Sequence, residues 1–138
     1  MSTAGGHPVG CALALEAIDI IINEKMIENV RHLEPIFMGG LKNFEDLEFI
    51  GESRGIGLMG ALEMVQDKKN KLPFDGSISI GERVANKCIE NGLICRPLGP
   101  SIVLCPPFIT SEEEMGIIFD TLEKTLKEVF SEVKSLGQ

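Results

Sequence analysis

The stretch of residues 9–22 is the feature that most restricts how this chain can fold. Its sequence is VGCALALEAIDIII, which as a helix is apolar on nearly every side and is interrupted only by Glu16 and Asp19. A helix of this kind is either buried on all sides or crosses between two bodies of protein. A chain of 138 residues has little other sequence to surround it. We therefore expect the rest of the chain to cover this helix only in part.

Composition excludes several classes of function. The net charge of −8 repels phosphate backbones and anionic lipid surfaces, so we expect no nucleic-acid and no membrane partner. The aromatic residues amount to 5% and are all Phe, which argues against base-stacking platforms and interfacial aromatic belts. No apolar run is long enough to span a bilayer. No Lys or Arg precedes residues 12–22, as it would in a signal peptide, so the sequence predicts a cytoplasmic location.

Cysteine usage argues against a metal site and against disulfides. The chain has four cysteines, which are Cys11, Cys88, Cys95 and Cys105. None of them has the C-x-x-C spacing of a zinc-ligand pair, so no metal is predicted. Cys95 and Cys105 could face each other across a hairpin, but disulfides are rare in a chain without an export signal.

Hydrophobic periodicity predicts two further long helices. One covers residues 26–44, where Pro35 and the Gly39-Gly40 pair should kink or divide it. The other is the last helix, which a capping box at Ser111 and Glu114 opens. Its apolar face consists of Met115, Ile118, Phe119, Leu122, Leu126, Val129, Phe130 and Val133.

A shorter helix and four strands are predicted between these two helices. The helix should begin with a capping box at Ser79 and Glu82 and end before Gly92. Residues 49–54 and 56–65 form two strands whose glycines suggest bulges or close backbone packing.

The other two predicted strands are residues 93–96 and 102–105, on either side of a Pro-Leu-Gly-Pro turn. Long helices over one face of a small, mainly antiparallel sheet give an α/β (α+β) fold, a two-layer sandwich.

Residues 3–8, TAGGHP, form a loop of small residues before the first helix. A hydroxyl followed by small residues at a helix start can present backbone N–H groups to a phosphate. Ordinary helix caps have the same pattern, and no Gly-Lys-Ser/Thr follows as in a Walker loop. His7 and Cys11 lie at the same helix start, but their spacing does not require contact, so we interpret Cys11 as a core thiol. The residues alone leave phosphate binding and plain capping both open.

Arg96 ends the predicted strand 93–96 and precedes the proline turn. A guanidinium held at a strand end can bind a carboxylate through two parallel hydrogen bonds. An exposed arginine at a sheet edge, which blunts strand pairing, explains the pattern as well and is favoured from the residues alone. Arg54 has a similar ambiguity.

Several blocks of the sequence resemble the class III aminotransferases, which are pyridoxal-phosphate enzymes of fold type I. Residues 3–15, TAGGHPVGCALAL, are similar to the family's T-x-x-G-H-P-x-x-x-A-x-A-L segment. Residues 54–63, RGIGLMGALE, also fit, as do residues 92–99, GLICRPLG, and residues 102–107, IVLCPP. The blocks occur in the family's order and span nearly the whole chain. Within the family, the chain is similar to the ω-amino acid:pyruvate and 4-aminobutyrate aminotransferases.

The resemblance implies the fold of the C-terminal small domain of fold type I enzymes. Residues 1–24 would form a cofactor-phosphate loop and connecting helix, and residues 25–138 the small domain. The cofactor would be pyridoxal 5′-phosphate. The reaction would transfer an amino group from an amine or ω-amino acid to a keto acid such as pyruvate, in a homodimer. Thr3 matches the threonine that binds the cofactor phosphate of the neighbouring subunit. Arg96 matches the mobile arginine that binds the substrate carboxylate.

The resemblance also implies that this sequence holds only part of the enzyme. In the family, three features precede the segment that begins here: the Schiff-base lysine, the aspartate that pairs with the pyridine nitrogen, and the glycine-rich phosphate loop. No lysine of this chain lies in a matching motif, so we expect the chain to be inactive alone, with no catalytic residue of its own. The uncovered side of residues 9–22 would then pack on the missing large domain. The alternative is a free-standing, non-enzymatic α/β ligand-binding or interaction module.

Overall fold

The computed structural model describes residues 5–135. Its helices and strands follow in the order α1 (Pro8–Asn23), α2 (Met26–Asn43), β1 (Ile50–Ile56), β2 (Met59–Met64), α3 (Ile80–Glu90), β3 (Arg96–Leu98), β4 (Ser101–Leu104) and α4 (Glu112–Ser135). Two short 3-10 helices, Phe44–Asp46 and Gly76–Ile78, precede β1 and α3.

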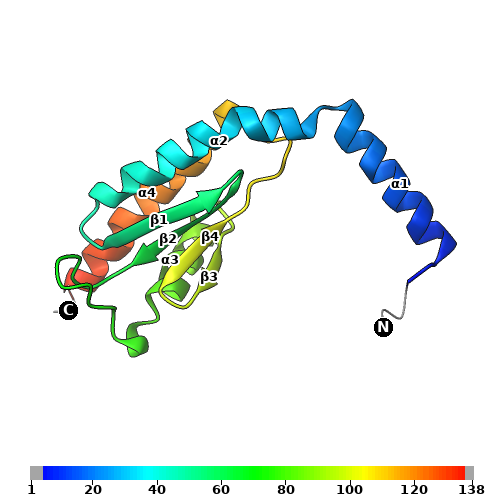
Figure 1. Ribbon diagram of the computed structural model, residues 1–138. Helices are drawn as coiled ribbons and strands as arrows, with labels where there is room; N and C mark the ends of the chain where they lie inside the picture. The colour runs from blue at the N-terminus through cyan, green and yellow to red at the C-terminus, as the bar shows by residue number, and fades with distance from the viewer. Residues whose placement is uncertain (1–4, 136–138) are drawn as a thin grey trace.

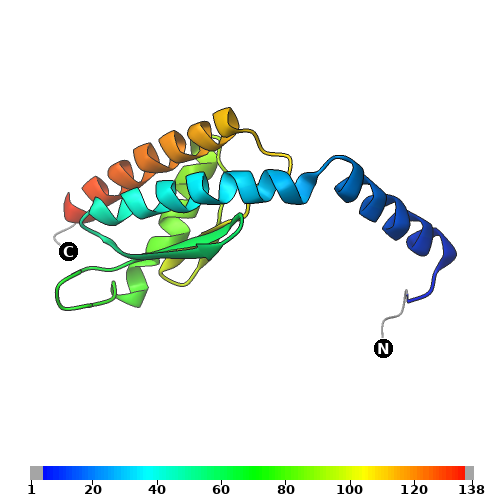
Figure 2. The same ribbon diagram turned by 45° about the horizontal axis from the view of Figure 1, so that its top comes forward.

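The four strands form one antiparallel sheet with the order β1-β2-β4-β3. Helices α2, α3 and α4 cover one face of this sheet, and the other face is open (Figures 1 and 2). The predicted two-layer α/β sandwich is therefore confirmed. The β1–β2 and β3–β4 pairs are antiparallel hairpins, each joined by a short turn. Strand β2 also pairs antiparallel with β4, although α3 and β3 lie between them in the chain.

Side-chain alternation divides the sheet residues between its two faces. Leu62 of β2 and Ile102 of β4 are cross-strand partners, and both are fully buried under the helices. Gly60 lies on the same face, and a Cβ atom there would lie only 2.3 Å from Leu41 of α2 and 2.8 Å from Phe37. The glycine therefore lets α2 lie directly on β2, and the close backbone packing predicted for these strands is confirmed.

Helix α2 runs without a break from Met26 to Asn43, so of the predicted kink or division at Pro35 the division is wrong. A proline inside a helix costs about 3 kcal/mol. Buried Leu33, Phe37 and Leu41 lie on one side of the helix and hold it against the core across that position. Gly40 does not break α2 either, because it provides the space in which the Phe119 ring of α4 packs.

One of the two predicted capping boxes is present. Ser111 N–H donates to Glu114 Oε2 at 2.8 Å, and Glu114 N–H donates to Ser111 Oγ at 3.2 Å, which confirms the start of α4. The box at Ser79 is wrong, since Ser79 has φ +49 and its side chain makes no capping hydrogen bond. Its hydroxyl donates instead to the Gly76 carbonyl in the preceding 3-10 turn, at 3.4 Å. Gly92 ends α3 as predicted.

The first hairpin turn lies two to three residues later than predicted, and the second lies within the predicted Pro-Leu-Gly-Pro turn. The first is Gly57-Leu58, where Gly57 has φ +57, a conformation that favours glycine. The predicted β-bulge is present, because the β1–β2 register shifts between Ile50 and Glu52.

The second turn is Gly99-Pro100, and Gly99 also has φ +57. Arg96 therefore begins β3 instead of ending a strand, and the predicted strand 93–96 is displaced. Pro97 is tolerated inside β3 because β3 is an edge strand.

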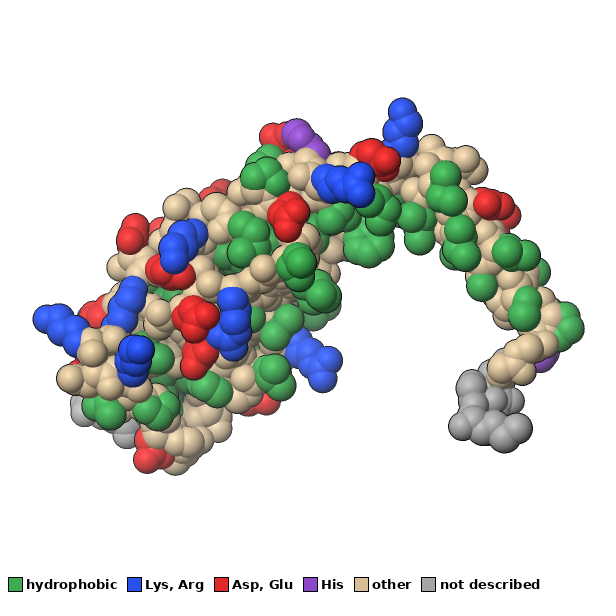
Figure 3. Space-filling view, viewed as in Figure 1, with side chains coloured by type: hydrophobic (Ala, Val, Ile, Leu, Met, Phe, Trp, Pro, Cys, Tyr) green, Lys and Arg blue, Asp and Glu red, His purple; other side chains and the backbone are tan. Residues whose placement is uncertain are grey.

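Helix α1 projects away from the sandwich, and none of its residues is buried (Figures 1 and 2). Its hydrophobic side chains lie open in the space-filling view (Figure 3). The rest of the described chain thus covers α1 even less than the sequence predicts. The link to α2 includes Lys25, which has φ +54, and this left-handed residue changes the direction of the chain between the two helices.

Candidate functional site

The open face of the sheet carries Arg96. The strand registers place Arg54, Ala61, Val103 and Arg96 in one row across all four strands. Since cross-strand partners share a face and Ala61 alternates with the buried Leu62, this row points away from the helices. Three strand spacings separate the two arginines, which is roughly 14 Å. Figure 3 shows acidic and basic side chains together over these strands.

Arg54 is already committed to neighbouring carboxylates. Its Nη1 donates to Glu63 Oε2 at 2.8 Å and lies 3.7 Å from Glu52 Oε2. The hydrogen bond with Glu63 raises the pKa of the Arg54 guanidinium above its ordinary value. The charge of the guanidinium is therefore balanced by these carboxylates, and its contact with Glu63 links β1 to β2.

Arg96 differs from Arg54 in its surroundings. Its side chain is exposed, and no carboxylate among residues 5–135 lies within ion-pair distance of it. Its five N–H donors are therefore open to an external anion. Its position on an edge strand matches the simpler sequence interpretation, but an edge position does not exclude a binding role.

The backbone that carries Arg96 is firmly held. Strand β3 pairs with β4 along its whole length, from Arg96↔Val103 to Leu98↔Ser101. The start of α3 presses on the hairpin turn, where a Cβ atom at Gly81 would lie 2.2 Å from the Gly99 carbonyl oxygen. The exposed Arg96 side chain thus projects from a backbone that both β4 and the start of α3 hold in place.

An apolar hollow of about 400 Å³ lies at the end of the open face. It is lined by Leu58, Met59, Cys105, Pro106, Pro107 and Phe108. Met59 precedes Ala61 by two residues and Cys105 follows Val103 by two, so both continue the open face beyond the Arg96 row. The open face therefore combines a free cation with a neighbouring apolar surface.

Asn29 of α2 fixes the segment that borders this hollow. Its Nδ2 donates to the Phe108 carbonyl at 2.7 Å and to the Thr110 carbonyl at 3.0 Å. Neither Met59 nor Phe108 was predicted from the sequence as a site residue. The alternation along β2, extended to its first residue, would have placed Met59 on the same face as Ala61.

The predicted phosphate loop is only partly described. Thr3 lies outside the described residues. Pro8 is the first residue of α1, as predicted, and Gly6 before it has φ +81. His7 occupies the N-cap position but makes no side-chain capping hydrogen bond, and the first turn contains no acidic residue. The N–H groups of this turn therefore have no side-chain acceptor among residues 5–135, which suits an anion.

The cysteines are all free, and Cys95 does not pair with Cys105. Cys95 is buried beside Cys88, and this contact together with burial raises the pKa of the Cys95 thiol. Cys105 lies exposed at the rim of the hollow. Cys11, which we interpreted as a core thiol, is instead exposed on α1, because the described chain buries no residue of that helix.

Among residues 5–135, no group of three or more His, Cys, Asp or Glu side chains could hold a metal ion. Of the helices described, none is long and apolar enough to cross a membrane.

Comparison with known proteins identifies the family. The model of the family "Aminotransferase class-III" matches residues 1–126. Gamma aminobutyrate transaminase 1 from Solanum lycopersicum is 38% identical over 134 residues, which are 97% of this chain and 26% of that protein. An adenosylmethionine-8-amino-7-oxononanoate aminotransferase from Methanocaldococcus jannaschii is 36% identical over 126 residues, 91% of this chain and 27% of that protein. The chain belongs to the class-III aminotransferase family.

Solved structures share the fold. An omega-transferase from Vibrio fluvialis JS17 superposes with a TM-score of 0.93 at 59% identity, over 96% of this chain and 32% of that chain. An omega-aminotransferase from Paracoccus denitrificans gives 0.92 at 60% identity, over 96% of this chain and 29% of that chain. The sequence thus spans about three tenths of the length of the relatives it matches.

Proposed function

We propose that this chain is the C-terminal part of a pyridoxal-phosphate-dependent aminotransferase. Its reaction would move an amino group from an amine or ω-amino acid to a keto acid such as pyruvate. Family membership supports this proposal, as do the similar structures, one of which is described as a PLP-bound aminotransferase from Vibrio fluvialis. The free guanidinium of Arg96 on the open sheet face is the observation that carries it.

Arg96 would bind the carboxylate of the keto acid or amino acid. A planar guanidinium forms two parallel hydrogen bonds with a carboxylate, which supplies both charge and orientation. The apolar hollow at Met59 and Phe108 lies farther along the same open face of the sheet. A substrate without a carboxylate would leave the exposed side chain free to turn aside.

The start of α1 would contribute to binding the cofactor phosphate. Thr3 supplies a hydroxyl, and the uncapped first turn that follows Pro8 supplies backbone N–H groups without a competing carboxylate. Pyridoxal phosphate, when bound, supplies the electron-withdrawing ring through which an amino group passes between substrates. The chain's own contribution would thus be to bind one phosphate and one carboxylate.

A large domain and a second subunit would cover α1. Its apolar residues stay exposed in this chain, including Val9, Leu13 and Ile22. Large exposed apolar surfaces mark interfaces. We propose a homodimer on this basis, with residues 1–24 as the connecting segment and residues 25–138 as the small domain. The four free cysteines suit a reducing compartment, and we propose the cytoplasm.

An amino-transfer assay of the full-length protein tests this function. Purified with pyridoxal phosphate, it should convert pyruvate to alanine when an amine or ω-amino acid is supplied. Formation of alanine is followed by chromatography, with the donor omitted as the control. A full-length protein that binds the cofactor but transfers no amino group between any such pair would refute the proposal.

A further inference from the structure

The Asn91-Gly92 dipeptide ends α3, and the fold needs both residues. Gly92 has φ +88, the left-handed conformation that favours glycine. Its N–H donates to the Ile89 carbonyl at 3.0 Å, and the Leu93 N–H donates to the Cys88 carbonyl at 2.8 Å. These two bonds form a Schellman motif, in which glycine takes the position that follows the helix cap.

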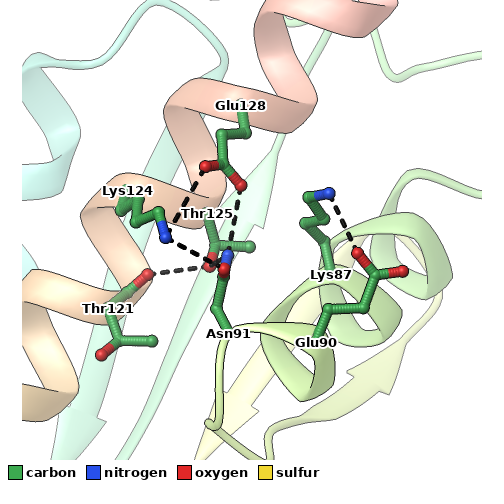
Figure 4. Close-up of polar contacts among 7 residues, drawn as sticks. All are labelled: Lys87, Glu90, Asn91, Thr121, Lys124, Thr125 and Glu128. Atoms are coloured by element: carbon green, nitrogen blue, oxygen red, sulfur yellow. Dashed lines mark hydrogen bonds and ion pairs between the residues drawn. The ribbon is translucent and has the colours of Figure 1, made fainter.

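The Asn91 side chain ties this helix end to α4 (Figure 4). Its Nδ2 donates to Thr125 Oγ1 at 3.0 Å and to Glu128 Oε2 at 3.2 Å. Its Oδ1 accepts from Lys124 Nζ at 3.2 Å. Thr125 is fully buried, and its hydroxyl donates to the Thr121 carbonyl at 2.8 Å, which leaves the oxygen lone pairs free for Asn91. Both ends of the amide therefore have partners.

An Asn-Gly dipeptide is also chemically labile, because glycine has no side chain to hinder its own nitrogen. In deamidation the Gly92 nitrogen attacks Asn91 Cγ, so a new C–N bond forms and a five-membered succinimide ring closes. The bond from Cγ to Nδ2 breaks, and the amide leaves as ammonia with the proton from the Gly92 N–H. Water then opens the ring to give aspartate or isoaspartate. The only co-reactant is solvent water.

We propose that Asn91 is a latent deamidation site that the fold holds closed. Ring closure requires the Asn91 Cβ to eclipse the Gly92 nitrogen about the Cα–C bond. With ψ at 4°, the Asn91 backbone nitrogen holds that eclipsed position instead. The Gly92 N–H is also engaged with Ile89, and three hydrogen bonds hold the amide. Modification must therefore wait until the end of α3 opens locally.

Deamidation would weaken the hydrogen bonds between Asn91 and α4 that hold the amide in the folded protein. Aspartate replaces the Nδ2 donor with an oxygen, and that oxygen would face the Glu128 carboxylate and repel it. Isoaspartate adds a carbon to the main chain inside the Schellman motif. Each product would loosen the junction between α3 and α4. Because the change is covalent, refolding would not reverse it.

Peptide mapping by mass spectrometry tests the proposal. The intact protein and the same protein unfolded in urea are incubated at one pH and temperature, and aspartate and isoaspartate at Asn91 are quantified over time. The unfolded chain should be modified more than about tenfold faster, since opening is required in the folded state. Equal rates in the two states, or no modification of the unfolded chain, would overturn the proposal.

Two variants separate local opening from general instability. Thr125→Val removes one hydrogen bond to Asn91 and should raise the folded-state rate about two- to tenfold. Ser111→Ala removes the capping box at the far end of α4 and should leave that rate unchanged. If Thr125→Val does not fold, Glu128→Ala removes a partly exposed acceptor instead. An equal increase in the Ser111 variant would show that global unfolding, not the Asn91 contacts, controls the site.

Discussion

The Phe119 ring of α4 occupies the space that a side chain at Gly40 of α2 would need. A Cβ atom at Gly40 would lie 2.3 Å from Cε2 and Cζ of Phe119, far inside van der Waals contact. The same ring is stacked on Phe37, with centroids 6.1 Å apart, and packs beside Phe44. The absence of a side chain at Gly40 therefore permits the close approach of the two long helices.

Gly40→Ala should destabilise the protein by about 1–3 kcal/mol, because Phe119 and its neighbours must move. Gly39→Ala is the matched control, since a Cβ there meets no atom within 4 Å. That variant should be stabilised by about 0.5–1 kcal/mol, because alanine favours the helix. Urea unfolding measures both. A loss of stability in the Gly39 variant as large as that in the Gly40 variant would contradict the packing argument.

Arg96→Ala in the full-length enzyme should raise the KM for pyruvate about ten- to a hundredfold, because a hydrogen-bonded charge pair is lost. The half-reaction with a carboxylate-free amine should change much less. Arg96→Lys should recover little, since an ammonium lacks the planar fork. Stopped-flow measurement of each half-reaction checks this.

Arg54→Ala is the control, because Arg54 is already paired with Glu63 on the same face. It should leave the ratio of the two half-reaction rates unchanged. Equal damage to both half-reactions in the Arg96 variant would mean that Arg96 serves the fold and not the substrate.

Helix α1 should make this chain associate, either with itself or with a larger partner chain. Leu13→Lys combined with Ile20→Lys should reduce the association, because both side chains are exposed on that helix. Ile89→Lys, on an exposed position of α3, should not. Sedimentation velocity over a range of concentrations measures the effect. A monodisperse monomer at the highest concentration would count against this prediction.

Low pH should weaken the hydrogen bonds that the Glu45 carboxylate accepts from Lys42 and Ser53. Hydrogen bonds from Lys42 and Ser53 lower the pKa of the Glu45 carboxyl from 4.5 to about 2. The fold thus favours the ionised form. Its contribution to stability is complete above pH 4.5 and is lost as the pH falls towards 2. Glu45→Gln should therefore flatten the decline in unfolding free energy over that window. Ser53→Ala, which removes only the hydroxyl donor, should have a smaller effect.

No single lysine of this chain should be trapped with the cofactor. Borohydride reduction after incubation with pyridoxal phosphate would fix any lysine that binds the aldehyde specifically, and mass spectrometry would locate it. Because no lysine here matches the family's motif, we expect only weak, scattered labelling. Stoichiometric pyridoxyl-lysine at one position, together with amino-group transfer, would show that this chain is catalytic by itself.

Most of the secondary structure was predictable because each signal is local. The apolar face of α4 and its Ser111–Glu114 capping box depend on residues three or four apart, and Gly92 ends α3 for a local backbone reason. The family could also be recognised, since its motifs are short and ordered. The structure of the loop at Thr3 stays a prediction.

Tertiary structure decided what local signals could not. Ser79 shows the same Ser-x-x-Glu pattern as Ser111, yet the preceding 3-10 turn holds it in a left-handed conformation and no capping box forms. The Gly40 glycine resembles a helix breaker until Phe119 from a distant helix is seen to fill its space.

Arg54 and Arg96 show the same difference between what the sequence reveals and what the tertiary structure reveals. Along the sequence, Arg54 and Arg96 each adjoin an apolar strand and look equivalent. Strand register then places Glu63 beside Arg54, whereas no described carboxylate reaches Arg96. The sequence by itself determined which residues carry charge and which segments form helices. Only the tertiary structure decided which charge is neutralised, because pairing depends on contacts between residues far apart in the chain.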